Sequence, residues 1–310
     1  MRTGAKIALG CLATPFVALL LFVLLFLVFR TMPLPESRMT TAQAEAPGVS
    51  VEALKAEGLS PGDAMPAQGA MPVNIRLEEG TFTVRAAPAG EGFKVEGKYD
   101  EAMYTLEQQL TRDSAGAAGY TMSFRPKYST LRRLLSQGFL EFEDGLNAIT
   151  VYLPQGVPMD LRVHASKGQS NLQLGGLALR HAELDLRMGE HSVSVASPNL
   201  VEMDELKVNG GMGELDLGGL GNLRAGSIVV WGRMGELGVD VGPEVDRDTK
   251  LFVRMRMGEM RVGLPPDARV QARSSVFLGD SRNIPHRSEG KHLIEVDAGM
   301  SLGEMRFNQN

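Results

Sequence analysis

A tripeptide of the form Met-Gly-Glu recurs along the second half of the chain. The glycines at its centre are Gly189, Gly213, Gly235 and Gly258, followed by Gly279 and Gly303 in copies that begin with leucine. Successive glycines lie 24, 22, 23, 21 and 24 residues apart, and a weaker copy, Lys167-Gly168-Gln169, precedes the first by 21 residues. A period of about 20 to 50 residues is typical of repeat proteins, whose units bury their apolar faces only against one another.

Apolar and polar residues alternate on both sides of each glycine. Leu184 and Leu186 precede Gly189, and Val193 and Val195 follow it. This period of two predicts half-buried strands. The phase changes across the tripeptide, because an odd number of residues separates the inward positions on its two sides. Since glycine adopts positive φ values without steric penalty, we expect the chain to turn a corner at each copy.

These features predict an all-β fold, a single-stranded β-helix (β-solenoid) of about ten coils over residues 71–310, preceded by one transmembrane α-helix. Each coil would pair with the next about 4.8 Å along the axis.

The methionines before the glycines fall in the inward phase of the alternation, so we expect them to fill the core. The alternative for these thioethers is binding of a soft metal such as Cu(I).

The N-terminal part of the chain divides into three segments. Residues 1–6 form a basic tail, and residues 7–29 form an uncharged, Leu/Val/Phe-rich run. As a helix rising about 1.5 Å per residue, this run would span about 34 Å, more than a bilayer core of about 30 Å. We therefore expect a single-pass transmembrane helix, with a flexible linker at residues 30–70. The basic tail favours a cytoplasmic N-terminus, which would place the solenoid in the periplasm or at the cell surface.

Charge and motif content exclude several classes of function. With 32 basic and 37 acidic residues, the chain has a net charge of −5 and lacks the basic surplus that nucleic-acid binding needs. Its one cysteine, Cys11, lies in the apolar N-terminal run, so the solenoid has no disulfide. The sequence contains no nucleophile elbow, P-loop or paired-cysteine motif. We expect no enzymatic activity and no cofactor.

The residue after each central glycine is acidic, which predicts a ladder of carboxylates on the outside of the rod. Its members are Glu190, Glu214, Glu236, Glu259, Asp280 and Glu304. Carboxylates about 5 Å apart suit Ca²⁺, but we favour the alternative that they bond to corner amides and face water, with no metal site. Trp231 falls out of phase with Val230, so we expect it to point outward as a second part of the candidate interaction surface.

Two parts of the chain resemble bacterial families. Leu153-Pro154-Gln155-Gly156-Val157-Pro158, with Leu172-Gln173-Leu174-Gly175-Gly176-Leu177, resembles the toast-rack, or adhesin-like, β-helix domains. Glu259-Met260-Arg261-Val262-Gly263-Leu264-Pro265, with Ser275-Val276-Phe277-Leu278-Gly279-Asp280, resembles the C-terminal domain of cell-wall-active antibiotics response proteins. Both resemblances imply a β-helix attached to membrane segments, with a role in surface interaction or envelope-stress regulation. Neither implies catalytic residues.

The sequence thus favours a non-enzymatic, membrane-anchored envelope protein that acts as a scaffold, an adhesive or a regulatory interaction module. The alternative is a surface glycan-binding or glycan-cleaving module that uses the acidic ladder. Strand edges at the ends of a solenoid can pair with other chains. We expect the last coil, near Met305 and Phe307, to offer such an edge for self-association or for an envelope protein partner.

Overall fold

The computed structural model describes residues 23–24, 37–45, 69–112, 118–128 and 147–309. Most of these residues belong to one sheet of 14 strands, with one 3-10 helix, η1. The elements are β1 (Met39–Glu45), β2 (Met71–Ala86), β3 (Lys94–Asp100), β4 (Tyr104–Arg112), β5 (Ala118–Pro126), β6 (Ala148–Leu153), β7 (Pro158–Gln173), β8 (Ala178–Ser194), β9 (Met203–Gly218), η1 (Leu220–Leu223), β10 (Ala225–Asp240), β11 (Thr249–Leu264), β12 (Arg269–Arg282), β13 (His286–Arg287) and β14 (Leu293–Gln309).

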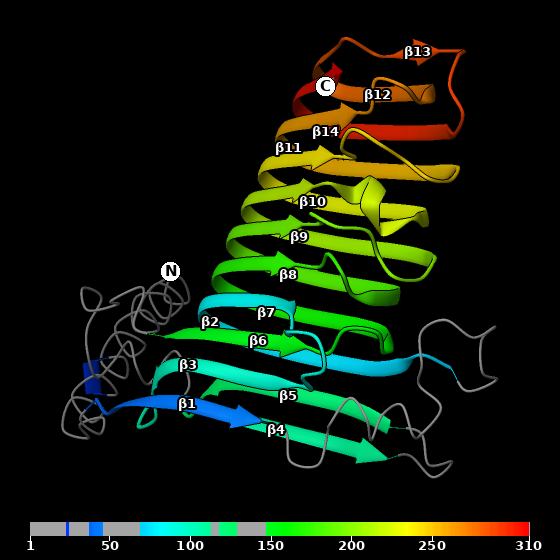
Figure 1. Cartoon of the computed structure of the whole chain (residues 1–310). Helices are drawn as coiled ribbons and strands as arrows, with labels where there is room; N and C mark the ends of the chain where they lie inside the picture. The colour runs from blue at the N-terminus through cyan, green and yellow to red at the C-terminus, as the bar shows by residue number, and fades with distance from the viewer. Residues whose placement is uncertain (1–22, 25–36, 46–68, 113–117, 129–146, 310) are drawn as a thin grey trace, which may run out of the picture.

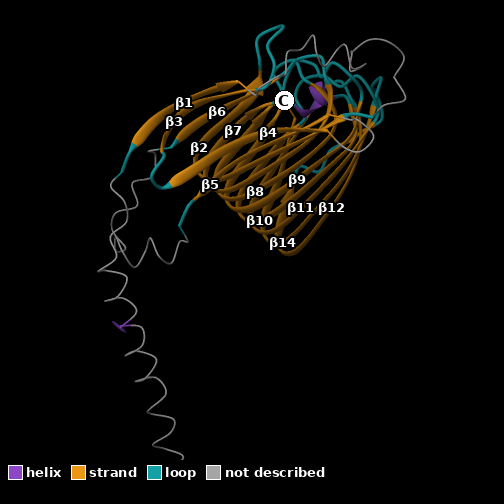
Figure 2. Cartoon of the chain, turned by 90° about the horizontal axis from the view of Figure 1, so that it is seen from below, coloured by secondary structure: helices purple, strands orange, loops and turns teal. Residues whose placement is uncertain are grey.

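Eight long strands of the described chain stack in parallel into a rod (Figure 1). Their order along the rod is β2, β7, β8, β9, β10, β11, β14 and β12. Each strand runs along one side, bends near its middle and returns along the other side, while the loops gather at the edge opposite the bend (Figure 2). The bends fan out around the rod from its N-terminal to its C-terminal end.

The interior of the rod lies between the two halves of each bent strand. In β10, Ile228 and Val230 before the bend and Leu237 and Val239 after it are at most 2 % exposed. They stack in register on the same positions of the neighbouring strands, as Leu237 does on Leu215. Each such side chain contributes about 1.5–3 kcal/mol by its burial. The all-β fold predicted from the alternation is therefore confirmed.

The regular stack ends at β2. The first half of β2 pairs in parallel with β5 and its second half with β6, while β4, β3 and β1 follow in antiparallel pairs. The described chain therefore contains eight bent strands rather than about ten coils, because the outer layers are built from separate short strands. Aromatic rings fill the interior here: the ring centroids of Phe93 and Tyr120 lie 4.0 Å apart, and those of Tyr104 and Phe124 lie 5.1 Å apart.

The segment before the rod departs from its predicted form. Residues 39–45, which lie inside the predicted flexible linker, form β1 and pair with β3 from Met39 against Asp100 to Glu45 against Lys94. The linker prediction is wrong for these residues, because their backbone groups satisfy the otherwise free edge of β3. The predicted transmembrane run 7–29 lies outside the described residues, apart from the helical Val23 and Leu24. No helix in the described ranges has the length and apolarity that crossing a bilayer would require.

The C-terminal end of the rod is not the end of the chain. β14 inserts between β11 and β12, so Met305 and Phe307 are fully buried rather than at an open edge. The prediction that they lie in an exposed last coil is wrong. The physical reason is the composition of the two strands: β14 carries large apolar residues on its inward side, whereas β12 has Ala272 and Ser274 there, which tolerate partial exposure. β12 is the outermost long strand.

Candidate functional site

The central glycines form a single column at the bend. Gly189, Gly213, Gly235, Gly258, Gly303 and Gly279 are aligned in register, with φ between +122° and +138°. L-residues rarely adopt this conformation. A Cβ on Gly235 would also overlap the carbonyl oxygen of Gly213 on the neighbouring strand. Each of these positions therefore requires glycine for two reasons, its backbone conformation and the close approach of the next strand.

The residues just before these glycines form an apolar ridge on the outside of the bend. Its members, with their exposed fractions, are Met188 (49 %), Met212 (52 %), Met234 (44 %), Met257 (40 %), Leu302 (41 %) and Leu278 (57 %). The prediction that the methionines fill the core is wrong. The last inward position lies two residues earlier, at Leu186 in β8, and the next is His191, so the odd step spans the whole bend.

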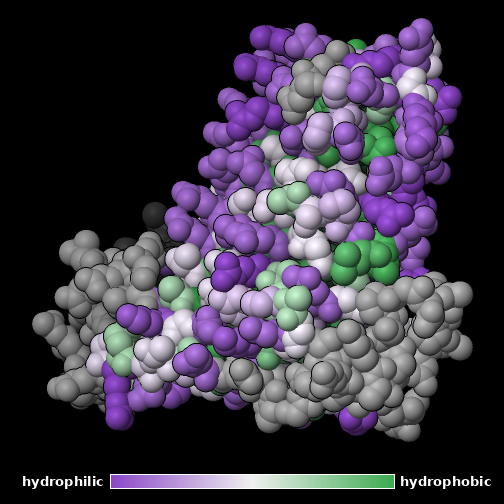
Figure 3. Space-filling model, in the orientation of Figure 1, coloured by the Kyte–Doolittle hydropathy of each residue, from purple (hydrophilic) through white to green (hydrophobic). Residues whose placement is uncertain are grey.

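Because the methionines point outward, their thioethers could be considered as ligands of a soft metal such as Cu(I). The same column continues as Leu302 and Leu278, which cannot bind a metal. What the six side chains share is apolar surface rather than a thioether, so Cu(I) binding does not account for the column. Most of the coloured surface in Figure 3 is hydrophilic. An apolar column repeated over six strands is a departure from that surface.

The acidic ladder lies on one flank of the ridge, along the second half of each strand. The register places Glu190, Glu214, Glu236 and Glu259 in sequence, followed by Glu304 and then Asp280. Arginines pair with three of the members: Arg261 with Glu236 at 3.0 Å, Arg306 with Glu304 at 2.8 Å and Arg282 with Asp280 at 2.9 Å. Glu214 is different, because the neighbouring carboxylates, chiefly that of Asp216, raise its pKa above the ordinary value.

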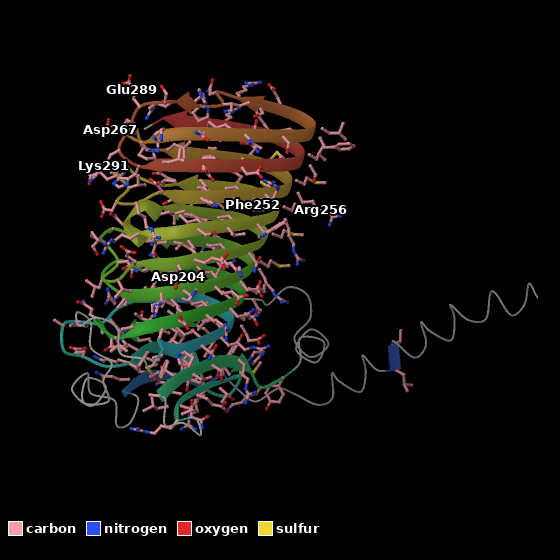
Figure 4. The ribbon with its side chains drawn as sticks, turned by 90° about the vertical axis from the view of Figure 1, so that its right-hand side faces the viewer. Asp204, Phe252, Arg256, Asp267, Glu289 and Lys291 are labelled. Carbon is pink, nitrogen blue, oxygen red and sulfur yellow. The ribbon has the colours of Figure 1, made fainter. Side chains whose placement is uncertain are left out.

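The opposite flank of the ridge is basic. Arg187, Arg233 and Arg256 precede the methionines of β8, β10 and β11, and all three are exposed. Arg256 projects from the edge of the stack in Figure 4. Arg187 pairs with Asp185 at 3.3 Å. Within the residues that the structure describes, neither Arg233 nor Arg256 has an ion-pair partner.

Trp231 lies on the same half of β10 as the basic flank and is 49 % exposed, so it points outward. It is not isolated: its ring lies 5.5 Å from that of Phe252 on β11. The guanidinium of Arg254 in turn lies 3.8 Å from the centre of the Phe252 ring. This stack of two aromatic rings and a cation holds Trp231 in place beside the basic flank.

A shallow polar groove lies on the acidic side of the ridge, along the second halves of the strands. It is lined by Thr83, Gln169, Asn171, Glu190, Ser192, Glu214 and Asp216, among others. Under it lies a buried pair: the hydroxyl of Ser170 is 2.7 Å from Nδ1 of His191. Both side chains belong to the inward column, between Phe82 and Leu215. The pair is therefore part of the core, although Ser170 and His191 also border the groove and are at most 5 % exposed.

His191 should make stability depend on pH. Burial lowers its pKa below the ordinary value of 6.5, and its buried Nε2 has no hydrogen-bond partner in the described structure. Below about pH 6.5 the unfolded chain binds a proton that the folded chain excludes, so the folded state loses stability as pH falls. Urea unfolding should give a lower midpoint at pH 5.5 than at pH 8. His191→Leu introduces the residue that β9 has at this position, Leu215, and should reduce the difference between the two urea midpoints. An unchanged difference would contradict the assignment to His191.

Two other histidines pair with carboxylates of neighbouring strands. Nδ1 of His164 lies 2.8 Å from Asp185, and Nδ1 of His181 lies 3.0 Å from Asp160. In the described ranges, no group of three or more His, Cys, Asp or Glu side chains is arranged to hold a metal ion. Cys11 lies outside these ranges.

The bent parallel strands, stacked glycine on glycine, define a β-solenoid. Residues 67–218 match the model of a family described as the N-terminal domain of toast_rack, DUF2154, and the chain therefore contains a toast-rack domain. The resemblance seen around Leu153-Pro154-Gln155-Gly156-Val157-Pro158 is confirmed. The likeness to cell-wall-active antibiotics response proteins concerns residues beyond 218, and it stays a prediction.

Three solved structures are similar to this chain at low identity. A candidate cell adhesion protein from Clostridium sporogenes ATCC 15579 is 13 % identical, with 89 % of this chain and 100 % of that chain covered and a TM-score of 0.42. A candidate adhesin from Bacteroides fragilis NCTC 9343 is 9 % identical, with 88 % and 99 % covered and a TM-score of 0.36. A candidate lipid-binding protein from Parabacteroides distasonis ATCC 8503 is 10 % identical, with 89 % and 98 % covered and a TM-score of 0.29. No curated protein matches the chain.

Proposed function

We propose that this chain is a non-enzymatic scaffold or adhesive module of the bacterial envelope, anchored in the membrane by residues 7–29 and exposing its solenoid outside the cytoplasmic membrane. The observation that carries the proposal is the regular surface of the rod. Every strand from β8 to β11 adds the same apolar and acidic groups about 4.8 Å further along the axis. A repeated surface of this kind suits an extended or repetitive partner.

The position of the buried serine and histidine supports a non-enzymatic role. Ser170 is 4 % exposed and His191 is 5 % exposed, so a substrate could reach neither without opening the core. The hydroxyl of Ser170 is hydrogen-bonded to Nδ1 of His191, the ring nitrogen nearer the backbone. This pair replaces one apolar contact in the inward column, and we assign it to packing.

Membrane attachment and orientation are tested together. In a bacterial host, the full chain should sediment with membranes and resist extraction with carbonate at high pH. A variant that lacks residues 7–29 should remain in the supernatant. Protease added to spheroplasts should degrade the solenoid while a cytoplasmic control protein survives. Protection of the solenoid until the membrane is broken would overturn the proposed orientation.

The polar groove supports a second candidate, a glycan-binding or glycan-cleaving surface. Amide, hydroxyl and carboxyl groups line it, and Glu214 has a raised pKa beside Asp216, a combination that glycosidases use for a general acid. Envelope polysaccharides should then bind the full chain, and Glu214→Gln should abolish binding or cleavage. Glu259→Gln, outside the groove, is the matched control. Absence of binding and of reducing ends in the unaltered protein would leave the scaffold role alone.

A further inference from the structure

Among the residues that the structure describes, the side chains of the apolar ridge are left half-exposed. Six half-exposed Met and Leu side chains follow one another along the bends of β8, β9, β10, β11, β14 and β12. Phe277, the residue before Leu278, is 83 % exposed at the end of the same ridge. Soluble proteins seldom expose a continuous apolar surface of this length unless something covers it.

The two flanks of the ridge have opposite charge, and both have charges left over. On the basic flank, Arg233 and Arg256 have no ion-pair partner within the described residues. On the acidic flank, Glu214 is surrounded by other carboxylates. Arg256 and Glu259 belong to the same bend, as do Arg233 and Glu236, although Glu236 also pairs with Arg261 of its own chain. The surface is thus basic, apolar and acidic across the bends of β8, β10 and β11, whereas Gly211, Ser301 and Phe277 take the place of the arginine in the other three bends.

This pattern is complementary to itself in one orientation. If a second copy faces the first across a two-fold axis parallel to the rod, its acidic flank lies opposite the basic flank of the first copy. Each bend then meets the same bend of the partner, so Arg256 faces the partner's Glu259. A two-fold axis perpendicular to the rod would instead place arginine opposite arginine. Like charges in contact would disfavour that orientation.

We propose that the apolar ridge is a self-association surface, at which two copies of this chain pair side by side with parallel solenoids. The ridge side chains pack against those of the partner, and the two pairs of charged flanks set the orientation. Both N-terminal ends lie on the same side, so two chains anchored in one membrane can form this pair. The inference goes beyond the scaffold role and holds whether or not residues 7–29 enter a bilayer.

The size of the surface sets the strength of the interaction. The ridge side chains are 40–57 % exposed, and only their full burial would bring a pair near the roughly 1,000 Å² at the low end for a specific interface. Because the bends fan out around the rod, the middle bends around Met234 and Met257 make the closest contact. A reversible dimer with a dissociation constant on the order of micromolar is expected.

Charge reversal tests the orientation. In the full chain in detergent micelles, Arg233→Glu with Arg256→Glu should weaken the dimer about tenfold or more by sedimentation velocity, and so should Glu236→Arg with Glu259→Arg. All four changes together should restore it. The proposal is overturned if the fourfold variant does not recover dimer formation, or if neither double variant weakens the dimer. If the ridge instead binds anionic vesicles, the arginine-to-glutamate variant would lose vesicle binding and the glutamate-to-arginine variant would gain it. Neither variant would form a dimer, and this outcome would also overturn the proposal.

Cross-linking tests the register. In a Cys11→Ala background, Met212→Cys should form a disulfide-linked dimer on oxidation with diamide, because Met212 meets Met212 of the partner subunit only in the parallel pair. In an antiparallel pair these residues would lie about 14 Å apart, too far for a disulfide. Met212→Leu should keep the dimer and Met212→Gln should weaken it. Equal effects of leucine and glutamine would show that apolar contact is not the cause, and would also overturn the proposal.

Discussion

Gly235→Ala should lower the free energy of unfolding by about 3 kcal/mol or more. At Gly235 the backbone has φ +122°, and the added Cβ would overlap the carbonyl oxygen of Gly213. The strand would have to move away from its neighbour, which breaks the stacking of the whole bend. The chain's one tryptophan, Trp231, lies four residues away on the same strand, so its fluorescence reports the loss directly.

A matched control separates the bend from glycine content in general. Gly218→Ala places a Cβ with no atom within 4 Å, at a glycine whose φ is not positive. Its free energy of unfolding should stay within about 0.5 kcal/mol of the unaltered chain. If both variants unfold at the same denaturant concentration, the bend does not require glycine and the corner geometry is wrong.

Leu237→Asp should unfold the rod, whereas Met234→Asp should be tolerated. Leu237 is 1 % exposed in the inward column, so the change removes its burial and places a carboxylate in an apolar interior. The expected loss is about 5 kcal/mol, which exceeds the stability of many domains. Met234 is 44 % exposed on the ridge, and its replacement should change the unfolding free energy by about 0.5 kcal/mol at most.

Circular dichroism and urea unfolding of the full chain measure this contrast. The two positions are three residues apart in the same strand, so general effects of a new charge on β10 are shared by both variants. Equal destabilisation would mean that Met234 is inside the rod after all, and the ridge would not exist. Retained stability of Leu237→Asp would mean that the alternation does not mark an interior.

The misplaced methionines show how far the alternation could be followed. Met188 continues the phase of Leu184 and Leu186, and only the position of the bend decides that it faces outward. One signal in the sequence pointed to the outside. The weaker copy has Lys167 in the methionine column, and lysine is almost never fully buried. In the structure Lys167 lies 3.4 Å from Glu79.

The order of the last strands could not be predicted from the sequence. β12 and β14 both carry the glycine corner and the acidic residue, so each fits the next place after β11. The choice depends on which strand covers β11 with more apolar surface. β14 does so with Val296, Met300 and Phe307, which are at most 5 % exposed.

Local chemistry thus determined the repeat, the all-β fold and the glycine corners, because alternation and backbone freedom are properties of neighbouring residues. The acidic ladder also followed, since its members share one position relative to each glycine. Only the tertiary structure decided which side of the bend the methionines occupy, where β14 inserts and that residues 39–45 cover the edge of β3. These features depend on competition between distant segments for the same buried surface or the same backbone hydrogen bonds, and no single segment records the outcome.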